Sequence, residues 1–206
     1  MNSYTAQPTD RQGRQPRVIQ DPPFARALFG NARFAWLWLV ARVYLGWQWV
    51  DAGRHKLQED AWMDGGMAVK GFWERAVAMP EGGRPAISYD WYRSMLQFML
   101  DREWYTWIGP TIAVGETLIG IALILGLFTG IAAFFGSALN MNFMLAGTAS
   151  TNPVLFAFAV ALMLAWKTAG WIGLDHWVLP LVGTPWRRAA QAEPALPTIE
   201  PQAIPA

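Results

Sequence analysis

The chain has 206 residues, of which 53% are hydrophobic, and its formal net charge at neutral pH is +1. Such a small charge excludes a strong overall field, so no nucleic acid is expected as a partner. The sequence has no cysteine. This excludes disulfides, thiolate metal sites and iron–sulfur clusters held by this chain.

Both ends of the chain differ in composition from its middle. Residues 1–32 carry arginines among prolines and glutamines, which predicts a flexible, mildly basic tail. No short apolar core with a small-residue cleavage site precedes Phe34, so we expect an uncleaved anchor rather than a signal peptide. Residues 184–206 form a Pro/Ala-rich stretch, which predicts a second flexible tail.

Between the tails, four long apolar stretches dominate the sequence. A helix that crosses a bilayer needs about 20 consecutive apolar residues. The stretches come close to this length, and several tryptophans flank them, as is typical of membrane interfaces. We therefore predict an all-α fold over residues 33–183, a four-helix transmembrane bundle. The expected spans are about 33–53, 107–128, 131–149 and 153–171.

The short connections at Thr129-Gly130 and Asn152-Pro153 predict antiparallel neighbours. Residues 54–106 are too long for a structureless connection. Their apolar spacing predicts two amphipathic helices, over 67–79 and 90–102, outside the membrane or capping the bundle.

Orientation follows from the number of spans and from the basic residues. An even number of spans places both termini on one side of the membrane. The arginine-rich start and Arg187-Arg188 favour the cytoplasmic side of a bacterial plasma membrane. The broken apolar stretch 172–183 is too short to cross and is expected to rest in the interface.

Charged side chains near the middle of two predicted spans are the main functional indication. Placing a charged group in hydrocarbon costs free energy, so such residues usually face the bundle interior and have bonding partners. Helix rise places Arg42 about 12 Å, Glu116 about 16 Å and Asn140 about 14 Å from the inner ends of their spans. All three depths lie near the midplane. We expect Arg42 and Glu116 to form an ion pair, with Asn140 bonding a remaining lone pair.

Two interpretations of this cluster stay open. The pair could simply fix helix register, as polar groups do between membrane helices. Alternatively, it could hold the head group of a quinone or a small anion, with Arg42 donating to an oxygen and Glu116 relaying a proton. His55 and His176 follow different spans, so a shared haem site is not expected, and no metal-ligand cluster stands out. Small residues at Ala132/Gly136 and Gly115/Gly120 predict close helix packing.

An ordered set of short motifs extends over residues 38–180. These are Arg42 with Leu45-Gly46, Gly53 with Lys56, Gly115-Glu116, Leu123-Ile124-Leu125-Gly126-Leu127, Asn140/Asn142, Asn152-Pro153, and Gly170 with Gly173-Leu174-Asp175. In this order and spacing the chain resembles the DoxX/DoxD family of small membrane proteins. One departure is Thr129-Gly130, where many relatives have Thr-Arg; any role of that arginine is absent here.

The resemblance implies a four-helix membrane bundle with cytoplasmic termini. It also implies kinship with the membrane subunit of thiosulfate:quinone oxidoreductase, which passes electrons from thiosulfate to a membrane quinone and works with a second subunit. Our leading hypothesis is therefore a membrane protein supporting quinone-linked redox chemistry. Arg42 and Glu116 would be its catalytic residues, and Asn140, Lys56 and Asp175 its binding residues.

The expected cofactor is quinone, with no metal or haem. The expected partners are the lipid bilayer, a redox partner subunit and, as an open alternative, further copies of this chain. Two other functions stay open. One is a non-enzymatic scaffold that docks a soluble redox enzyme. The other is a small-solute transporter, for which four spans without inverted repeats leave little room unless the chain oligomerises.

Overall fold

A computed structural model describes residues 21–182, and every regular element in that range is helical. The predicted all-α class is confirmed, while most of the N-terminal tail (1–20) and the whole C-terminal tail (184–206) lie outside the described residues. A 3-10 turn, Ala32–Phe34, follows the first helix. The helices are α1 Pro23–Gly30, α2 Ala35–Leu57, α3 Asp60–Met63, α4 Met67–Val77, α5 Asp90–Asp101, α6 Tyr105–Leu125, α7 Thr129–Leu145, α8 Asn152–Leu164, α9 Trp166–Ala169 and α10 Asp175–Leu181.

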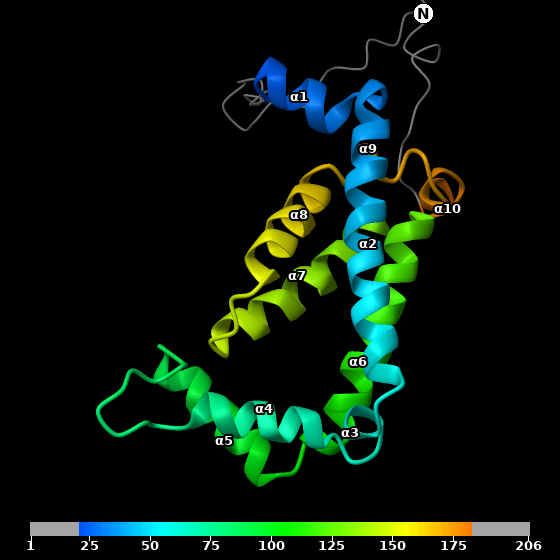
Figure 1. The fold of residues 1–206 in the computed structure, drawn as a ribbon. Helices are drawn as coiled ribbons and strands as arrows, with labels where there is room; N and C mark the ends of the chain where they lie inside the picture. Colours follow the sequence, from blue (N-terminus) through cyan, green and yellow to red (C-terminus); the bar gives the residue numbers. More distant parts are fainter. Residues whose placement is uncertain (1–20, 183–206) are drawn as a thin grey trace, which may run out of the picture.

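The antiparallel pair α2 and α6 forms the spine of the molecule (Figure 1). Their backbones approach closely at glycines. A Cβ on Gly120 would lie 2.5 Å from the Val50 nitrogen, and one on Gly46 would lie 2.8 Å from the Gly120 oxygen. The predicted packing role of Gly120 is thus confirmed. That of Gly115 is wrong, because a Cβ there would meet open space.

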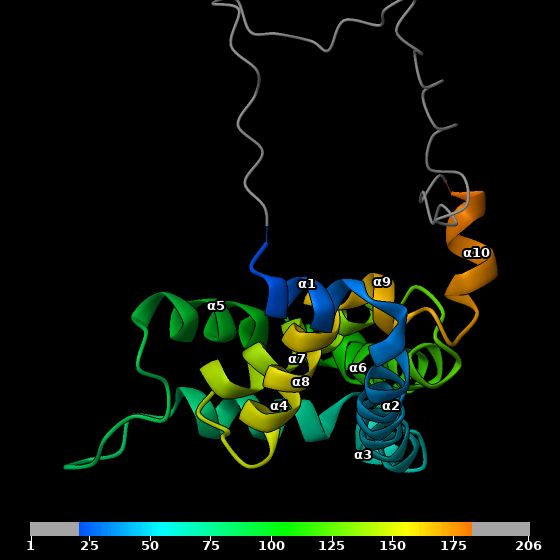
Figure 2. The ribbon, with the colours of Figure 1, turned by 90° about the horizontal axis from the view of Figure 1, so that it is seen from above.

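The helices α7 and α8 form a second antiparallel arm beside the spine (Figure 1). The turn before α7 is tight because Gly126 and Phe128 both adopt left-handed backbone conformations, with φ of 67° and 47°. The fourth predicted span is interrupted: α8 ends at Leu164, and the short α9 follows after Ala165. Figure 2 shows α10 projecting away from the other helices.

The long connection contains the two predicted amphipathic helices, which are confirmed as α4 and α5. They cross one end of the molecule (Figure 1) and have an apolar core of their own, which includes Trp73 and Leu96. The Tyr92 hydroxyl donates a hydrogen bond of 3.0 Å to the Asn142 carbonyl oxygen on α7. This bond fastens the α4–α5 layer to the second arm. The short helix α3 was not predicted.

The N-terminal segment departs from the prediction at Pro23–Gly30, which is the helix α1 and not part of a flexible tail. Its Leu28 and Phe29 pack against the core of the bundle. Two side chains fasten its carbonyl groups: Trp38 Nε1 donates to Leu28 O at 2.9 Å, and Thr168 Oγ1 donates to Phe29 O at 2.6 Å. The basic, proline-containing composition of the region hid these few packing residues.

Among the described residues, one helix is both long and apolar enough to cross a membrane, namely α6 with 21 residues. Two further helices are apolar but shorter: α7 has 17 residues and α8 has 13. The 23 residues of α2 give sufficient length, but charged side chains such as Arg42 and Asp51 lower its hydropathy. The fold therefore contains one candidate span.

Candidate functional site

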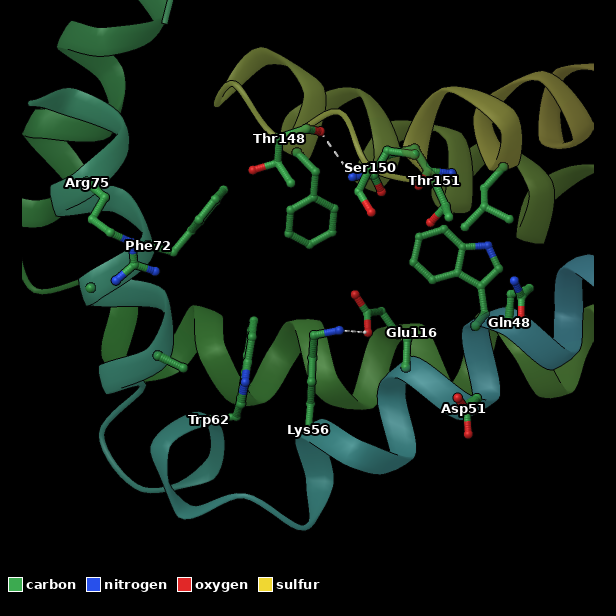
Figure 3. Close-up of a pocket in the computed structure, with 18 of the residues that line it drawn as sticks. Gln48, Asp51, Lys56, Trp62, Phe72, Arg75, Glu116, Thr148, Ser150 and Thr151 are labelled. Carbon is green, nitrogen blue, oxygen red and sulfur yellow. Dashed lines mark hydrogen bonds and ion pairs between the residues drawn. The ribbon is translucent and has the colours of Figure 1, made fainter. Parts of the chain in front are cut away.

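A cavity of about 680 Å³ lies between α2, α4, α6 and α7 and the loop that joins α7 to α8 (Figure 3). Its size is that of a small-molecule site. Its walls combine aromatic rings with polar groups. Trp62 and Phe72 lie toward one end, Gln48 toward the other, and Ser150 and Thr151 face them from the α7–α8 loop (Figure 3).

An ion pair between Lys56 and Glu116 lies on one wall of this cavity (Figure 3). Lys56 Nζ lies 2.6 Å from Glu116 Oε2, and the exposed fractions of the two side chains are 18% and 1%. Glu116 belongs to the face of α6 that packs on α2, and Lys56 comes from the last turn of α2. The close approach at Gly53, where a Cβ would collide with Thr117, brings this turn onto α6.

The lysine has a second neighbour. Its Nζ lies 5.1 Å from the centre of the Trp62 ring, a cation–π distance. The ammonium group is thus held between a carboxylate and an aromatic face, with one side open to the cavity. Such an arrangement neutralises the buried carboxylate and leaves N–H donors of Lys56 available.

Two polar groups in the cavity wall have no bonding partner within residues 21–182. Asn140 is fully buried, and neither its amide nitrogen nor its amide oxygen is hydrogen-bonded. The indole nitrogen of Trp49, which rests against Gly136, is also buried and unbonded in this range. Nearly all buried polar groups in proteins are bonded, and leaving one unsatisfied costs about 1–3 kcal/mol. Both residues belong to the lining of the cavity.

The predicted Arg42–Glu116 ion pair is wrong. Glu116 pairs with Lys56, whereas Arg42 Nη2 donates at 2.7 Å to the backbone oxygen of Ile172. The guanidinium packs against Gly126 at the end of α6, where it occupies the space that a Cβ would need. The carboxylate that acts on it electrostatically is Asp175. Arg42 and Glu116 therefore belong to two separate clusters.

Helix register explains this error. Gly53 lies against residues 113–117 and Gly46 against residues 120–124, so Arg42 is level with Gly126. Glu116 is ten residues from Gly126 along α6, which is about 15 Å. The predicted depths took Phe34 and Leu127 as the inner ends of the first two spans and treated them as level. In the structure, α2 begins roughly two turns beyond the end of α6.

Asp175 has a clear role in the Arg42 cluster. Its carboxylate oxygens accept hydrogen bonds from the backbone nitrogens of Phe128, at 2.5 Å, and Thr129, at 2.9 Å. These are free donors at the start of α7, where a negative charge also suits the helix dipole. Arg42 sits correspondingly at the carbonyl end of α6. The cluster fastens the α6–α7 turn to the C-terminal segment.

Of the five predicted site residues, Glu116, Lys56 and Asn140 line the cavity, and Arg42 and Asp175 lie together at the other end of the spine. Two cavity residues were missed as site residues. Trp49 lies on the first expected span, and its ring nitrogen was the only signal that it could act as a donor. Arg75 lies on the polar face of the predicted 67–79 helix, and only its tertiary position reveals its place in the cavity.

The two histidines also lie in separate places. His55 Nε2 is 3.6 Å from Asp51 Oδ1 at the exit of α2. The ring of His176 lies 4.7 Å from that of Trp171 near α10. Within residues 21–182, no three His, Asp or Glu side chains gather closely enough to hold a metal ion.

Comparison with known proteins adds no assignment. No protein-family model, curated protein or solved structure matches this chain. The structure itself defines an all-helical protein with one candidate membrane span and a cavity that contains a buried Lys–Glu pair. The resemblance to the DoxX/DoxD family stays a prediction.

Proposed function

We propose that this chain is a multi-pass membrane protein that binds a quinone head group in the Lys56–Glu116 cavity and supports quinone-linked redox chemistry. The observation that carries the proposal is the combination of a buried ion pair with unbonded Asn140 and Trp49 groups in one cavity of suitable size.

The membrane setting is supported by the outer faces of the helices. Large apolar side chains are exposed on all four long helices, and such extensive exposure is unusual in soluble proteins. Examples are Trp36, Val40 and Trp47 on α2, Leu118 and Leu125 on α6, Phe134 and Phe135 on α7, and Val154 and Leu164 on α8. We propose that α2, α6, α7 and the α8–α9 pair cross the bilayer, with both termini cytoplasmic and α4 and α5 on the outer side.

This topology has a direct test, because the chain has no native cysteine. Single cysteines would be introduced as Ser3→Cys, Glu81→Cys and Gln191→Cys. A membrane-impermeant maleimide should label the Glu81→Cys variant in intact cells, and should label the other two only after permeabilisation. Labelling of all three variants in intact cells, or of none, would contradict the proposed orientation.

The chemistry of the cavity suits a quinone. A quinone presents two carbonyl oxygens on a flat ring and is reduced by two electrons and two protons. Asn140 Nδ2, Trp49 Nε1 and Lys56 Nζ are donors that can bond such oxygens. The ring of Trp62 supplies an apolar surface. Lys56 and Glu116, already sharing a contact of 2.6 Å, are placed to deliver or accept a proton at a bound oxygen.

Electrons must come from outside this chain. With no cysteine, no disulfide or sulfur cluster of its own can carry them. We propose a partner subunit as their source. In the thiosulfate reaction that the resemblance implies, two thiosulfate ions join through a new S–S bond and release two electrons. The quinone takes up these electrons with two protons to give the quinol.

Quinone binding is the experiment that tests the proposal. A tail-free benzoquinone would be titrated against the purified full-length chain in detergent by calorimetry. Lys56→Met should weaken binding by about tenfold or more, because it removes a charged donor. The matched variant Lys70→Met removes the lysine of an exposed pair with Glu74, outside the cavity, and should bind normally. Equal affinities in both variants, or no binding to the wild type, would refute the site.

A further inference from the structure

A second cavity, of about 240 Å³, lies beside the first between α4, α5, α6 and α7. Its walls are almost entirely apolar, with side chains such as Leu96, Met99, Ile112 and Leu139. We refer to it as the apolar cavity, and to the Lys56–Glu116 cavity as the polar cavity.

The two cavities share a wall. Trp62, Phe72 and Phe143 line both of them. The rings of Phe72 and Phe143 meet edge to face, with 6.1 Å between their centres. Three aromatic side chains thus lie at the boundary between a polar compartment and an apolar one. A ligand that occupied both compartments would have to pass these rings.

Tyr92 and Asn142, which line the apolar cavity, already bond to groups of this chain. Tyr92 donates to Asn142 O at 3.0 Å and lies 3.3 Å from Asn142 Oδ1. Asn142 Nδ2 in turn donates to Ala138 O at 2.8 Å. This contrasts with the polar cavity, where Asn140 and Trp49 have no partner within residues 21–182. One compartment offers hydrogen bonds to a ligand and its neighbour offers only apolar contact.

We propose that the two cavities together bind one amphiphilic molecule, a quinone with a hydrocarbon tail, whose tail passes between Phe72 and Phe143 into the apolar cavity. This inference rests on the proposed function and locates the hydrocarbon tail of the membrane quinone that the resemblance implies. The contact that holds the tail is packing against Leu96, Met99 and Ile112, on two different helices.

In this proposal the helices α4 and α5 enclose the tail of the ligand. They supply most of the apolar cavity, and Phe72 on α4 lines both compartments. They contact the spine mainly through α4 against α6, and the Tyr92 bond links α5 to the arm. A layer of this kind covers the end of the bundle and encloses a tail that would otherwise remain in the lipid.

The test compares a tail-free benzoquinone with the same head group carrying a decyl chain. Both would be titrated by calorimetry against the full-length chain in one detergent. Tail partitioning into micelles raises apparent affinity for any protein, so the informative quantity is the ratio of the two affinities in each variant. Met99→Trp fills the apolar cavity, and Ile112→Phe fills it from another helix. Met79→Trp is the matched control, because Met79 is exposed and lines neither cavity.

Filling the apolar cavity should lower the affinity ratio by about tenfold, comparable to losing a methylene or two from a fitted pocket, and leave tail-free binding unchanged. The control should keep the wild-type ratio. Unchanged ratios in both filled variants, with normal tail-free binding, would overturn the tail site and leave the proposed function standing. Failure of both quinones to bind the wild type would overturn both proposals. Equal binding of decanol would show a general lipid site and also overturn the inference.

Discussion

Replacing Lys56 by Met should destabilise the fold strongly, because it leaves the Glu116 carboxylate buried without its partner. Removing one member of a buried ion pair costs about 3–5 kcal/mol. Glu116 is 1% exposed and the contact is 2.6 Å, but Lys56 is 18% exposed at an open cavity. Since water from the cavity can solvate part of the remaining charge, we expect the lower end of this range, about 3 kcal/mol. Unfolding would be followed by circular dichroism in mixed detergent–SDS micelles.

The double variant Lys56→Met/Glu116→Leu separates charge burial from packing. Apolar replacement of both partners is often neutral or stabilising, so the double variant should recover most of the lost stability while failing to bind quinone. Lys70→Met is the control, since its pair with Glu74 spans 4.0 Å at the surface and is worth about 0.3–0.5 kcal/mol. If Lys56→Met costs no more than Lys70→Met, or if the double variant is less stable than Lys56→Met, the reasoning fails.

Three further predictions concern the rest of the fold. Asp175→Ala should lower the free energy of unfolding by more than the value of a helix cap, which is about 1–2 kcal/mol, because it also removes the carboxylate that acts on buried Arg42. Asp175→Asn, which keeps an acceptor oxygen, should cost less than Asp175→Ala. Chemical unfolding measures both, and equal effects would argue against the cap. Gly120→Ala should destabilise the fold by about 1–3 kcal/mol, because the new Cβ meets the Val50 backbone. Gly115→Ala should leave stability unchanged, because a Cβ there meets open space. Melting temperatures of both variants equal to that of the wild type would contradict the packing of Gly120. Burial raises the pKa of Tyr92 from 10.0 to about 12. Between pH 10 and 12 the folded chain therefore keeps the Tyr92 phenol neutral, whereas the unfolded chain ionises it. The stability that comes from the neutral phenol is complete below pH 10. It is lost between pH 10 and 12, at up to about 1.4 kcal/mol per pH unit. Tyr92→Phe should remove this loss of stability when the free energy of unfolding is measured between pH 10 and 12. The same slope of stability against pH in the variant and the wild type would contradict the prediction.

Local patterns in the sequence were sufficient to predict much of the fold. Apolar spacing identified α4 and α5 within about two residues of their observed ends, and the breaker Pro80–Pro85 separates them. The prediction of antiparallel neighbours was also correct, but the connections lie slightly earlier than predicted: Thr129-Gly130 already begins α7 and Asn152-Pro153 already begins α8. These features depend on neighbouring residues only, which is why one sequence was enough to find them.

The pairing of charges could not be predicted in the same way, because it depends on how far α2 slides along α6. That offset is set by three close approaches, at Gly46, Gly53 and Gly120, and by the extra turns with which α2 begins. A shift of about two turns exchanges Arg42 for Lys56 as the partner of Glu116. Charge spacing within one helix carries no information about this offset. The glycines that determine it are visible in the sequence, but which glycine meets which is not.

The register of α2 on α6 places the two charged clusters in different surroundings. In the Arg42 cluster, the carboxylate of Asp175 is bonded to the backbone of the α6–α7 turn, and the guanidinium is packed against Gly126 and bonded to Ile172 O. Arg42 and Asp175 are only 1% and 0% exposed, although a cavity of about 500 Å³ borders Asp175 and Thr129. The Lys56–Glu116 pair instead borders a cavity of about 680 Å³, beside a fully buried Asn140 that has no partner within residues 21–182. Reactive groups need both a perturbing neighbour and access for substrate. The second cluster has both, whereas in the first cluster both Asp175 oxygens already accept bonds from the backbone. Substitutions in the first should therefore act on stability, and substitutions in the second should act on binding even where stability is restored.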